Sequence, residues 1–332
     1  MSTHRVDVVR IKEIQKHPNA DSLGLVLIHG WTCAVRLGDF QPGDLCAYIE
    51  PDYIVPSPEE HPAGALFAFL GDKRRIKAKR LRGTWSQGLL VRAPEGAAEG
   101  EDVMEKLGIK RWEPPIQFGT DGDAERPCDA IAHVPKFDVE NWRRYKHLLV
   151  EGEIVCVTEK LHGANARYAF REDRMWCGSR TQWKRPPAEG RQPGDPWWQG
   201  LKQNPWIETW CRANPDAVLY GEVFGQVQDL RYDTERGQIK FAAFAVLRGN
   251  AWEKMADFWD FRVDGVEESA LRVPLLYVGP YSEAKMEELS MGDSAIAKHL
   301  AEGIVITPEN ERTDPEIGYL QLKLVSNRYL ER

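Results

Sequence analysis

The chain has 332 residues, of which 42% are hydrophobic and 29% charged, and its formal net charge is −7. This length suits about two domains, and no apolar run approaches the roughly 20 residues of a membrane-spanning helix, which excludes an integral membrane protein. The charged stretch Met1–Lys12 is unlike a secretory signal, so we expect a cytoplasmic protein. Six widely spaced cysteines without a CxxC pair predict reduced thiols and argue against a zinc site.

Residues 5–110 have the pattern of a small β-barrel. Short alternating segments predict strands over 6–11, 23–28, 46–49 and 88–91, with turns such as HPNAD and QPGD between them. The order of HPNADSLGLVLI, GDFQPGD and RLRGTWSQGLLV resembles the tRNA-binding-type OB domain of some aminoacyl-tRNA synthetases. Such a barrel is a common platform for single-stranded nucleic acid.

Charge is segregated along the chain. The run KRRIKAKRLR, Lys73–Arg82, holds seven basic residues and no acid. It is either a solvated hairpin or a phosphate contact, and its place on a predicted OB domain favours the second.

A domain boundary is predicted where Gly, Pro and acidic residues accumulate. We expect a short helix over 101–107, an OB domain over 1–115, a linker over 116–135 and a second domain over 136–332. The second domain is predicted to be α+β and dominated by antiparallel strands. Its predicted helices are 137–149, 206–212, 252–261 and 282–289, and its predicted strands are 154–158, 166–170, 218–221, 241–247, 303–307 and 319–325.

The segment EKLHGAN, residues 159–165, lies between two predicted strands, so Lys160 is expected in a tight turn that Gly163 permits. A surface lysine is usually a solvated cation, so the neighbouring motifs decide its interpretation. A nucleophilic lysine must lose its proton, and nearby cations or a metal lower its pKa from the usual value of about 10.4.

Four further segments carry groups suited to a nucleotide. Glu222 stands between glycines in LYGEVFG, where it can accept hydrogen bonds from ribose hydroxyls. Glu302 precedes a strand in EGIVI, where it can hold a divalent metal. Alternation in QLKLVS places Lys323 on the face of Gln321, where it can meet a phosphate. FAAFAV, residues 241–246, offers aromatic rings for stacking on adenine.

In this order, the motifs resemble those of the covalent nucleotidyltransferase superfamily of ATP-dependent ligases and capping enzymes. EKLHGAN, with His162 and Asn165, is similar to the RNA ligase branch, whereas DNA ligases typically have KxDG. With the N-terminal OB domain, the whole chain resembles the Deinococcus-type RNA ligases, which join 3′-OH and 5′-phosphate RNA ends, especially at duplex nicks. The resemblance implies an α+β protein with an N-terminal OB-fold barrel followed by an antiparallel-sheet, ATP-grasp-like nucleotidyltransferase domain.

The resemblance also implies catalytic roles. Lys160 would attack the α-phosphorus of ATP, Lys323 would stabilise the charge that develops there, and Glu302 would support the catalytic Mg²⁺ or Mn²⁺. His162, Asn165 and Arg180 match positions tied to later steps that engage RNA, and Arg143 is a predicted phosphate contact. The expected nucleotide-binding residues are Glu159, Asn165, Glu222, Phe244 and Ile304, with Phe244 and Ile304 on opposite faces of the base.

The sequence departs from the family pattern at two positions. Gln321 stands where a second lysine is common, and Ala245 stands where an aspartate often follows the aromatic residue. The chain also lacks motif VI and a C-terminal OB domain, which argues against a DNA ligase or a capping enzyme.

Two other functions stay open from the sequence. One is a DNA or mixed-strand nick ligase, which would share the first chemical step. The other is a noncatalytic RNA-binding protein with a decayed transferase domain, against which the intact Lys160, Glu222, Glu302 and Lys323 argue. We expect RNA as the partner and neither a membrane nor an obligate protein partner.

Overall fold

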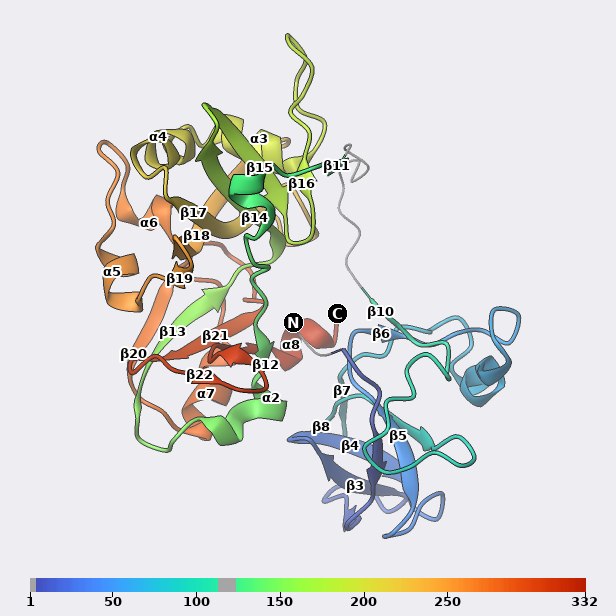
Figure 1. Cartoon of the computed structure of the whole chain (residues 1–332). Coiled ribbons are helices and arrows are strands. Elements are labelled where there is room, and N and C mark those ends of the chain that lie inside the picture. The colour runs from blue at the N-terminus through green and yellow to red at the C-terminus, as the bar shows by residue number, and fades with distance from the viewer. Residues whose placement is uncertain (1–3, 113–123) are drawn as a thin grey trace. The chain divides into compact units, whose positions relative to one another are not determined.

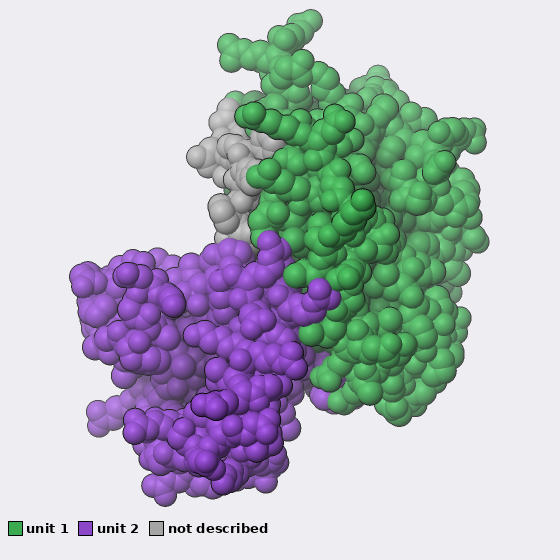
Figure 2. Space-filling view, turned by 180° about the vertical axis from the view of Figure 1, so that it is seen from behind, with its two compact units in different colours: residues 1, 114–140, 148–324 green, residues 2–113, 141–147, 325–332 purple. Residues whose placement is uncertain are grey.

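The computed structural model describes residues 4–112 and 124–332 (Figure 1). The chain divides into two compact units, which Figure 2 colours separately. The barrel unit comprises Ser2–Glu113, Asn141–His147 and Val325–Arg332, and the sheet unit comprises Met1, Pro114–Glu140 and Leu148–Leu324. The predicted linker over 116–135 lies partly outside the described residues. Within the described ranges, no helix combines the length and apolarity needed to cross a membrane.

Short antiparallel strands build the barrel unit. They form the sheets β1-β5-β9, β2-β3-β4, β10-β6 and β7-β8. Alternate side chains of β1, β5 and β9 point into one apolar core that includes Val8, Ala47, Ile49 and Val91. The elements are β1 (Val8–Arg10), β2 (Gln15–Lys16), β3 (Leu23–Ile28), β4 (Trp31–Arg36), β5 (Leu45–Ile49), β6 (Tyr53–Ile54), η1 (Pro62–Leu70), β7 (Lys79–Leu81), β8 (Thr84–Ser86), β9 (Leu89–Arg92), β10 (Lys110–Arg111) and α8 (Asn327–Leu330).

The helix predicted over 101–107 is wrong, because this segment forms turns. Asp102 Oδ1 accepts hydrogen bonds from the backbone N–H groups of Val6 and Met104, each at 3.0 Å. An aspartate that bonds to the backbone two residues ahead stabilises a turn in place of a helix.

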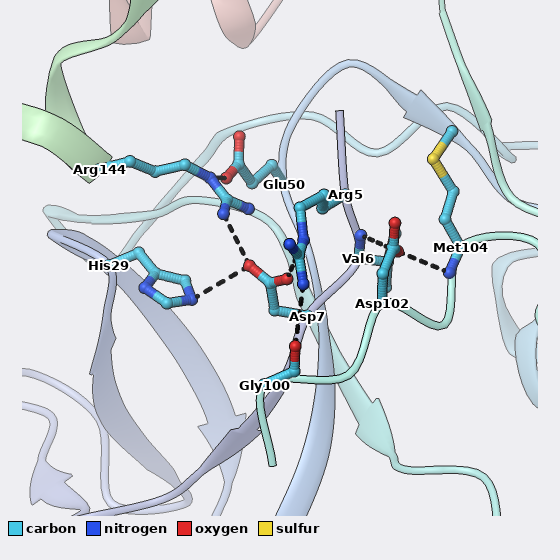
Figure 3. A network of polar contacts seen from close by, with 9 residues as sticks. All are labelled: Arg5, Val6, Asp7, His29, Glu50, Gly100, Asp102, Met104 and Arg144. Atoms are coloured by element: carbon cyan, nitrogen blue, oxygen red, sulfur yellow. Dashed lines mark hydrogen bonds and ion pairs between the residues drawn. The ribbon is translucent and has the colours of Figure 1, made fainter. Parts of the chain in front are cut away.

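Residues 141–147 are attached to the barrel unit by buried ion pairs (Figure 3). The Arg144 guanidinium lies 2.6 Å from both Asp7 Oδ2 and Glu50 Oε1; the two acids are buried, and the Arg144 side chain is 12% exposed. The two carboxylates raise the pKa of Arg144 against the opposing effect of burial. Arg144 is therefore a structural cation of the barrel unit.

The single helix predicted over 137–149 is also wrong. The segment contains β12 (Glu140–Asn141), α2 (Trp142–Tyr145) and the 3₁₀ turn η2 (Lys146–Leu148). Asn141 has an extended backbone, and its side chain accepts a hydrogen bond from Arg143 N at 2.9 Å. This N-cap starts the helix at Trp142.

Two antiparallel sheets form the frame of the sheet unit. The larger has the order β11-β16-β15-β14-β17-β18-β19 and the smaller the order β12-β24-β21-β13-β20. Their strands are β11 (Ala124–Glu125), β13 (Ile154–Lys160), β14 (Gly163–Arg171), β15 (Arg174–Ser179), β16 (Trp183–Lys184), β17 (Ala217–Gly225), β18 (Ile239–Arg248), β19 (Ala251–Trp252), β20 (Leu275–Pro280), β21 (Gly303–Pro308) and β24 (Leu322–Val325). The remaining elements are α1 (Asp129–Ala132), α3 (Pro196–Gln203), α4 (Trp206–Ala213), α5 (Met255–Asp260), α6 (Glu268–Leu271), α7 (Glu283–Ser290), β22 (Thr313–Asp314) and β23 (Gly318–Tyr319).

The larger sheet has an apolar core on each face. Helices α3 and α4 cover one face, where Trp197, Trp206 and Trp210 pack with Tyr168 and Phe241. Asp195 caps α3 by accepting from Trp197 N and Trp198 N at 3.0 and 2.9 Å. Most of the tryptophans between 180 and 218 therefore contribute to packing.

Candidate active site

The chain crosses directly from the smaller to the larger sheet at the EKLHGAN segment. Lys160 ends β13, and β14 begins at Gly163, so two residues join strands of different sheets. A Cβ on Gly163 would lie 2.1 Å from Val223 O on the neighbouring strand β17. Glycine is needed here because two backbones approach closely, which is a different reason from the turn that we expected.

A chain of charged groups begins at Lys160. Its Nζ lies 2.6 Å from Glu302 Oε1, and Glu302 Oε2 lies 3.3 Å from His162 Nδ1. His162 Nε2 lies 2.6 Å from Oδ1 of Asp229, whose side chain is 53% exposed. Strand pairing explains the first contact, because Lys160 lies opposite Gly303, the residue after Glu302.

The pKa values of this group reflect its pairing. Burial opposes ionisation of Glu302, but Lys160 and His162 lower its pKa to about 2. Burial likewise opposes protonation of His162, while Asp229 and Glu302 raise its pKa to about 9. At neutral pH, Glu302 is therefore an anion between two cations.

Glu222 belongs to the same site, but nearby cations do not offset the effect of burial on its carboxyl group. Burial raises its pKa to about 8, with Lys160 lowering the value and Glu302 raising it further. It lies in β17 opposite Asn165 of β14, so the two side chains share one face of the larger sheet. Both were predicted to bind the nucleotide.

Glu159 and Ile304 are also neighbours. They lie opposite each other in the β13–β21 ladder, and both are buried. Glu159 Oε2 accepts a hydrogen bond from Ala295 N at 2.8 Å, and burial raises the pKa of this carboxyl group.

Phe244 lies at an irregularity of β18. The pairing register between β17 and β18 shifts there, because Tyr220 lies opposite Ala245 while Gly221 lies opposite Ala243. The shift places Phe244 with Tyr220 in one apolar cluster, and the Phe244 ring packs on Phe137 with centroids 4.8 Å apart. Ala245, which departs from the family pattern, therefore lies at this shift in the strand pairing.

Lys323 occupies a partly exposed position of β24, between buried Leu322 and Leu324. Gln321, where a second lysine is common, is buried and donates from Nε2 to Thr307 Oγ1 at 2.8 Å. A lysine at 321 would lose this neutral pairing, which gives a structural reason for the departure.

The two arginines predicted to contact RNA have partners within their own units. Arg180 Nη1 lies 3.3 Å from Asp138 Oδ1 in the sheet unit. Arg143 is buried in the barrel unit, with its guanidinium 4.7 Å from the Trp31 ring centroid and Nη1 3.3 Å from Gly30 O. Their proposed roles with RNA stay predictions.

Three residues of the site were missed by the sequence analysis: Asp229, Tyr232 and His299. Tyr232 OH accepts a hydrogen bond from His162 N at 2.6 Å, and its ring contacts the His299 ring with centroids 4.7 Å apart. The polar segments QDLRYD and GDSAIAKHL, which flank the motifs of Glu222 and Glu302, were the only sequence signal for them.

Comparison with protein families matches both parts of the chain. A family described as RNA ligase matches residues 153–325, more than half of the chain, and an OB-fold domain family matches residues 5–93. No curated protein sequence matches the chain.

Solved structures of Naegleria gruberi RNA ligase are similar over nearly the whole length. A lysine-to-alanine variant with ATP and Mn has 22% identity and a TM-score of 0.78, covering 99% of this chain and 98% of that one. The same ligase with PPi has 24% identity and a TM-score of 0.77, with coverage of 99% and 98%. A glutamate-to-alanine variant with AMP and Mn has 22% identity and a TM-score of 0.76, with 98% of each chain covered. The predicted fold, an N-terminal OB domain followed by an antiparallel-sheet domain, is confirmed.

Proposed function

Because the chain belongs to the RNA ligase family, we propose that it uses ATP to join a 3′-OH end of RNA to a 5′-phosphate end through Lys160. Nicks in duplexes are the proposed substrate, as in ligases of the Deinococcus type. The observation that carries the proposal is the position of Lys160 at the junction of two sheets, 2.6 Å from Glu302 and within the electrostatic influence of Glu222. The similar Naegleria ligase structures that contain ATP, AMP, PPi and Mn support the choice of nucleotide and metal.

The first step consumes ATP. Lys160 leaves Glu302, loses a proton and attacks the α-phosphorus, so that an N–P bond forms and the bond to pyrophosphate breaks. Lys323 offers positive charge to the phosphate oxygens, and Glu222 accepts hydrogen bonds from the ribose. Glu159, Asn165, Phe244 and Ile304 contact the nucleoside.

The next two steps use RNA. A 5′-phosphate oxygen attacks the AMP phosphorus, which releases Lys160 and leaves AMP on the RNA end. The 3′-OH then loses its proton and attacks the 5′-phosphorus, and AMP departs. His162 acts in these steps, with Arg180 and Arg143 as phosphate contacts.

The residues present fit a divalent metal. Glu302 is a buried anion, and its charge destabilises the ionised form of Glu222. Added positive charge would therefore stabilise both carboxylates. Among the described residues, no three His, Cys, Asp or Glu side chains form a cluster suited to a metal. Glu302 would therefore share Mg²⁺ or Mn²⁺ with phosphate oxygens and water, as Mg²⁺ sites commonly do. When bound, the ion supplies positive charge to the phosphates.

The barrel unit is the proposed site of RNA docking. Within the basic run, Lys79, Arg80 and Arg82 are exposed on the β7–β8 hairpin. By contrast, Arg75 is engaged with Asp52 and with the Trp112 ring, 3.2 Å from its centroid. These three exposed cations of the hairpin are proposed to meet phosphate.

The test uses α-labelled ATP with Mn²⁺ and denaturing electrophoresis. Wild type and the control Lys285→Ala, which removes a partly exposed lysine paired with Glu288, should retain label, whereas Lys160→Ala should not. Label on Lys160→Ala would remove Lys160 from this role. Absence of label on AMP-free wild type would favour a noncatalytic RNA-binding protein.

Substrate identity is tested with nicks. Sealing should be fastest with RNA on the 3′-OH side, and equal rates with DNA there would indicate a mixed-strand or DNA nick ligase.

The docking role of the barrel unit is tested by replacing Lys79, Arg80 and Arg82 with alanine. This change should weaken nick binding and reduce the slope of log binding constant against log salt concentration by about 2–3, while Lys160 labelling persists. Alanine at the exposed Arg191, Lys202 and Arg236 is the matched control.

A further inference from the structure

Two buried polar atoms beside Lys160 have no hydrogen-bond partner in the part of the chain that the structure describes. They are Glu159 Oε1 and His299 Nε2. Glu159 is 1% exposed and directly precedes Lys160 in β13. Buried polar atoms are nearly always paired, so two unpaired atoms at one site indicate a ligand.

Both atoms act as hydrogen-bond acceptors. His299 Nδ1 lies 2.8 Å from Leu300 O, and a carbonyl oxygen can only accept, so Nδ1 carries the ring proton. In the neutral ring, Nε2 then presents its lone pair. At Glu159, Ala295 N and the Ser294 side chain interact with the carboxylate, and Oε1 has no hydrogen-bond partner among the described residues.

The loop that carries His299 is held in place. Ser294 N donates to His299 O at 2.8 Å, and Lys298 N donates to Asp233 Oδ2 at 2.9 Å. The His299 ring also contacts Tyr232, whose hydroxyl is bound by His162 N. The acceptor on His299 is therefore fixed before any ligand arrives.

The loop that carries His299 contacts Glu159 directly. The loop binds one oxygen of Glu159 through Ala295 N, and His299 lies four residues further along the same loop. Ile304 lies opposite Glu159 in the ladder and lends an apolar surface beside the two acceptors. A flat group with an amino group at its edge suits such a pair of acceptors.

We propose that Glu159 Oε1 and His299 Nε2 accept the two hydrogens of the 6-amino group of adenine, so that His299 sets the choice of ATP over nucleotides with a 6-oxo purine. This inference rests on the proposed function. Guanine and hypoxanthine present a carbonyl oxygen at this position, which would face two further acceptors. Sites built to bind an N–H group reject ligands that lack it strongly, because their own polar atoms then stay unpaired.

The test measures Lys160 labelling with four α-labelled triphosphates: ATP, purine riboside triphosphate, ITP and GTP. Wild type should favour ATP over ITP by about a thousandfold or more in kcat/KM, and over purine riboside triphosphate by about tenfold or more. His299→Phe keeps an aromatic ring without the acceptor. It should raise KM for ATP with little change in kcat and lower the ATP/ITP ratio at least tenfold.

A second measurement is independent of catalysis. Equilibrium binding of ATP and ITP to Lys160→Ala should show the same loss of selectivity when His299→Phe is added. The matched control is His133→Phe, at an exposed histidine. An ATP/ITP ratio that stays within twofold in His299→Phe would overturn the proposal. If this variant does not fold, equal kcat/KM of wild type for ATP and purine riboside triphosphate would overturn it.

The two levels of proposal fail differently. Wild type that takes no label from any triphosphate would refute the proposed function. Wild type that takes label from ATP, with base selectivity unaffected by His299→Phe, would refute only the role of His299.

Discussion

Lys160 and Glu302, 142 residues apart in the chain, form an ion pair with 2.6 Å between Nζ and Oε1. While Nζ is held in this pair, it cannot attack a phosphorus atom. Glu302 thus positions Lys160 in the ligand-free protein and must release it for the reaction with ATP.

We expect Glu302→Gln to slow Lys160 labelling by about a hundredfold or more, because the amide cannot supply the charge that a metal needs. The rate of label incorporation under single-turnover conditions measures this loss. Glu309→Gln, at an exposed position just after β21, is the control and should behave as wild type. A Glu302→Gln rate within threefold of wild type would contradict the assignment.

Asp229 is a predicted positioning residue. It holds the Nε2 side of His162 while Glu302 holds the Nδ1 side. Asp229→Ala should free one side of the ring and reduce sealing of a pre-adenylylated nick about tenfold, with a smaller effect on Lys160 labelling. Asp229→Asn keeps an acceptor and should restore most sealing, whereas the exposed Asp264→Ala is the control. Equal losses of both activities would argue against this role.

Glu222 should make the ligand-free protein less stable as pH rises. Its pKa is about 8 in the fold against 4.5 ordinarily, so between these values the unfolded chain releases the proton first. Stability from this group is therefore lost across that window. Glu222→Gln should increase the free energy of unfolding by about 1–3 kcal/mol at pH 8. Thermal melts of the variant and wild type should converge below pH 4.5, and a destabilised variant at pH 8 would refute the burial argument.

Arg144→Met should destabilise the barrel unit by about 3–5 kcal/mol, because the buried Asp7 and Glu50 would lose the cation that they share, with Asp7 keeping its ion pair with Arg5. Denaturant unfolding measures the effect. Arg10→Met is the control, since its ion pair with Glu99 is exposed and should contribute less than about 1 kcal/mol. Equal unfolding midpoints of the two variants would show that the buried pairs do not stabilise the fold.

The success of sequence-based prediction depended on how local each signal was. Strands around Lys160, Glu222 and Glu302 follow from alternation within single segments, and the structure confirms them. The single helix predicted over 137–149 was wrong because the Asn141 cap and the Arg144 ion pairs outweigh the apolar pattern of this segment.

Contacts between distant loops could not be read from periodicity. Asp229 reaches His162 across 67 residues, and His299 and Tyr232 lie in separate loops without a repeating pattern. The reason for Gly163 was likewise invisible, since it depends on the backbone of another strand.

The barrel unit is not one continuous stretch of chain, which affects how its role can be dissected. A fragment ending at residue 115 would lack Arg144 and the last helix, whose Asn327 binds Gln87 and whose Leu330 O accepts from Ala78 N. It would lack the cation that Asp7 and Glu50 share, and it would leave the edge beside Ala78 open. Truncation would therefore confound lost RNA affinity with a damaged barrel, and a deletion that spares the ligase domain would still have to remove three separate segments.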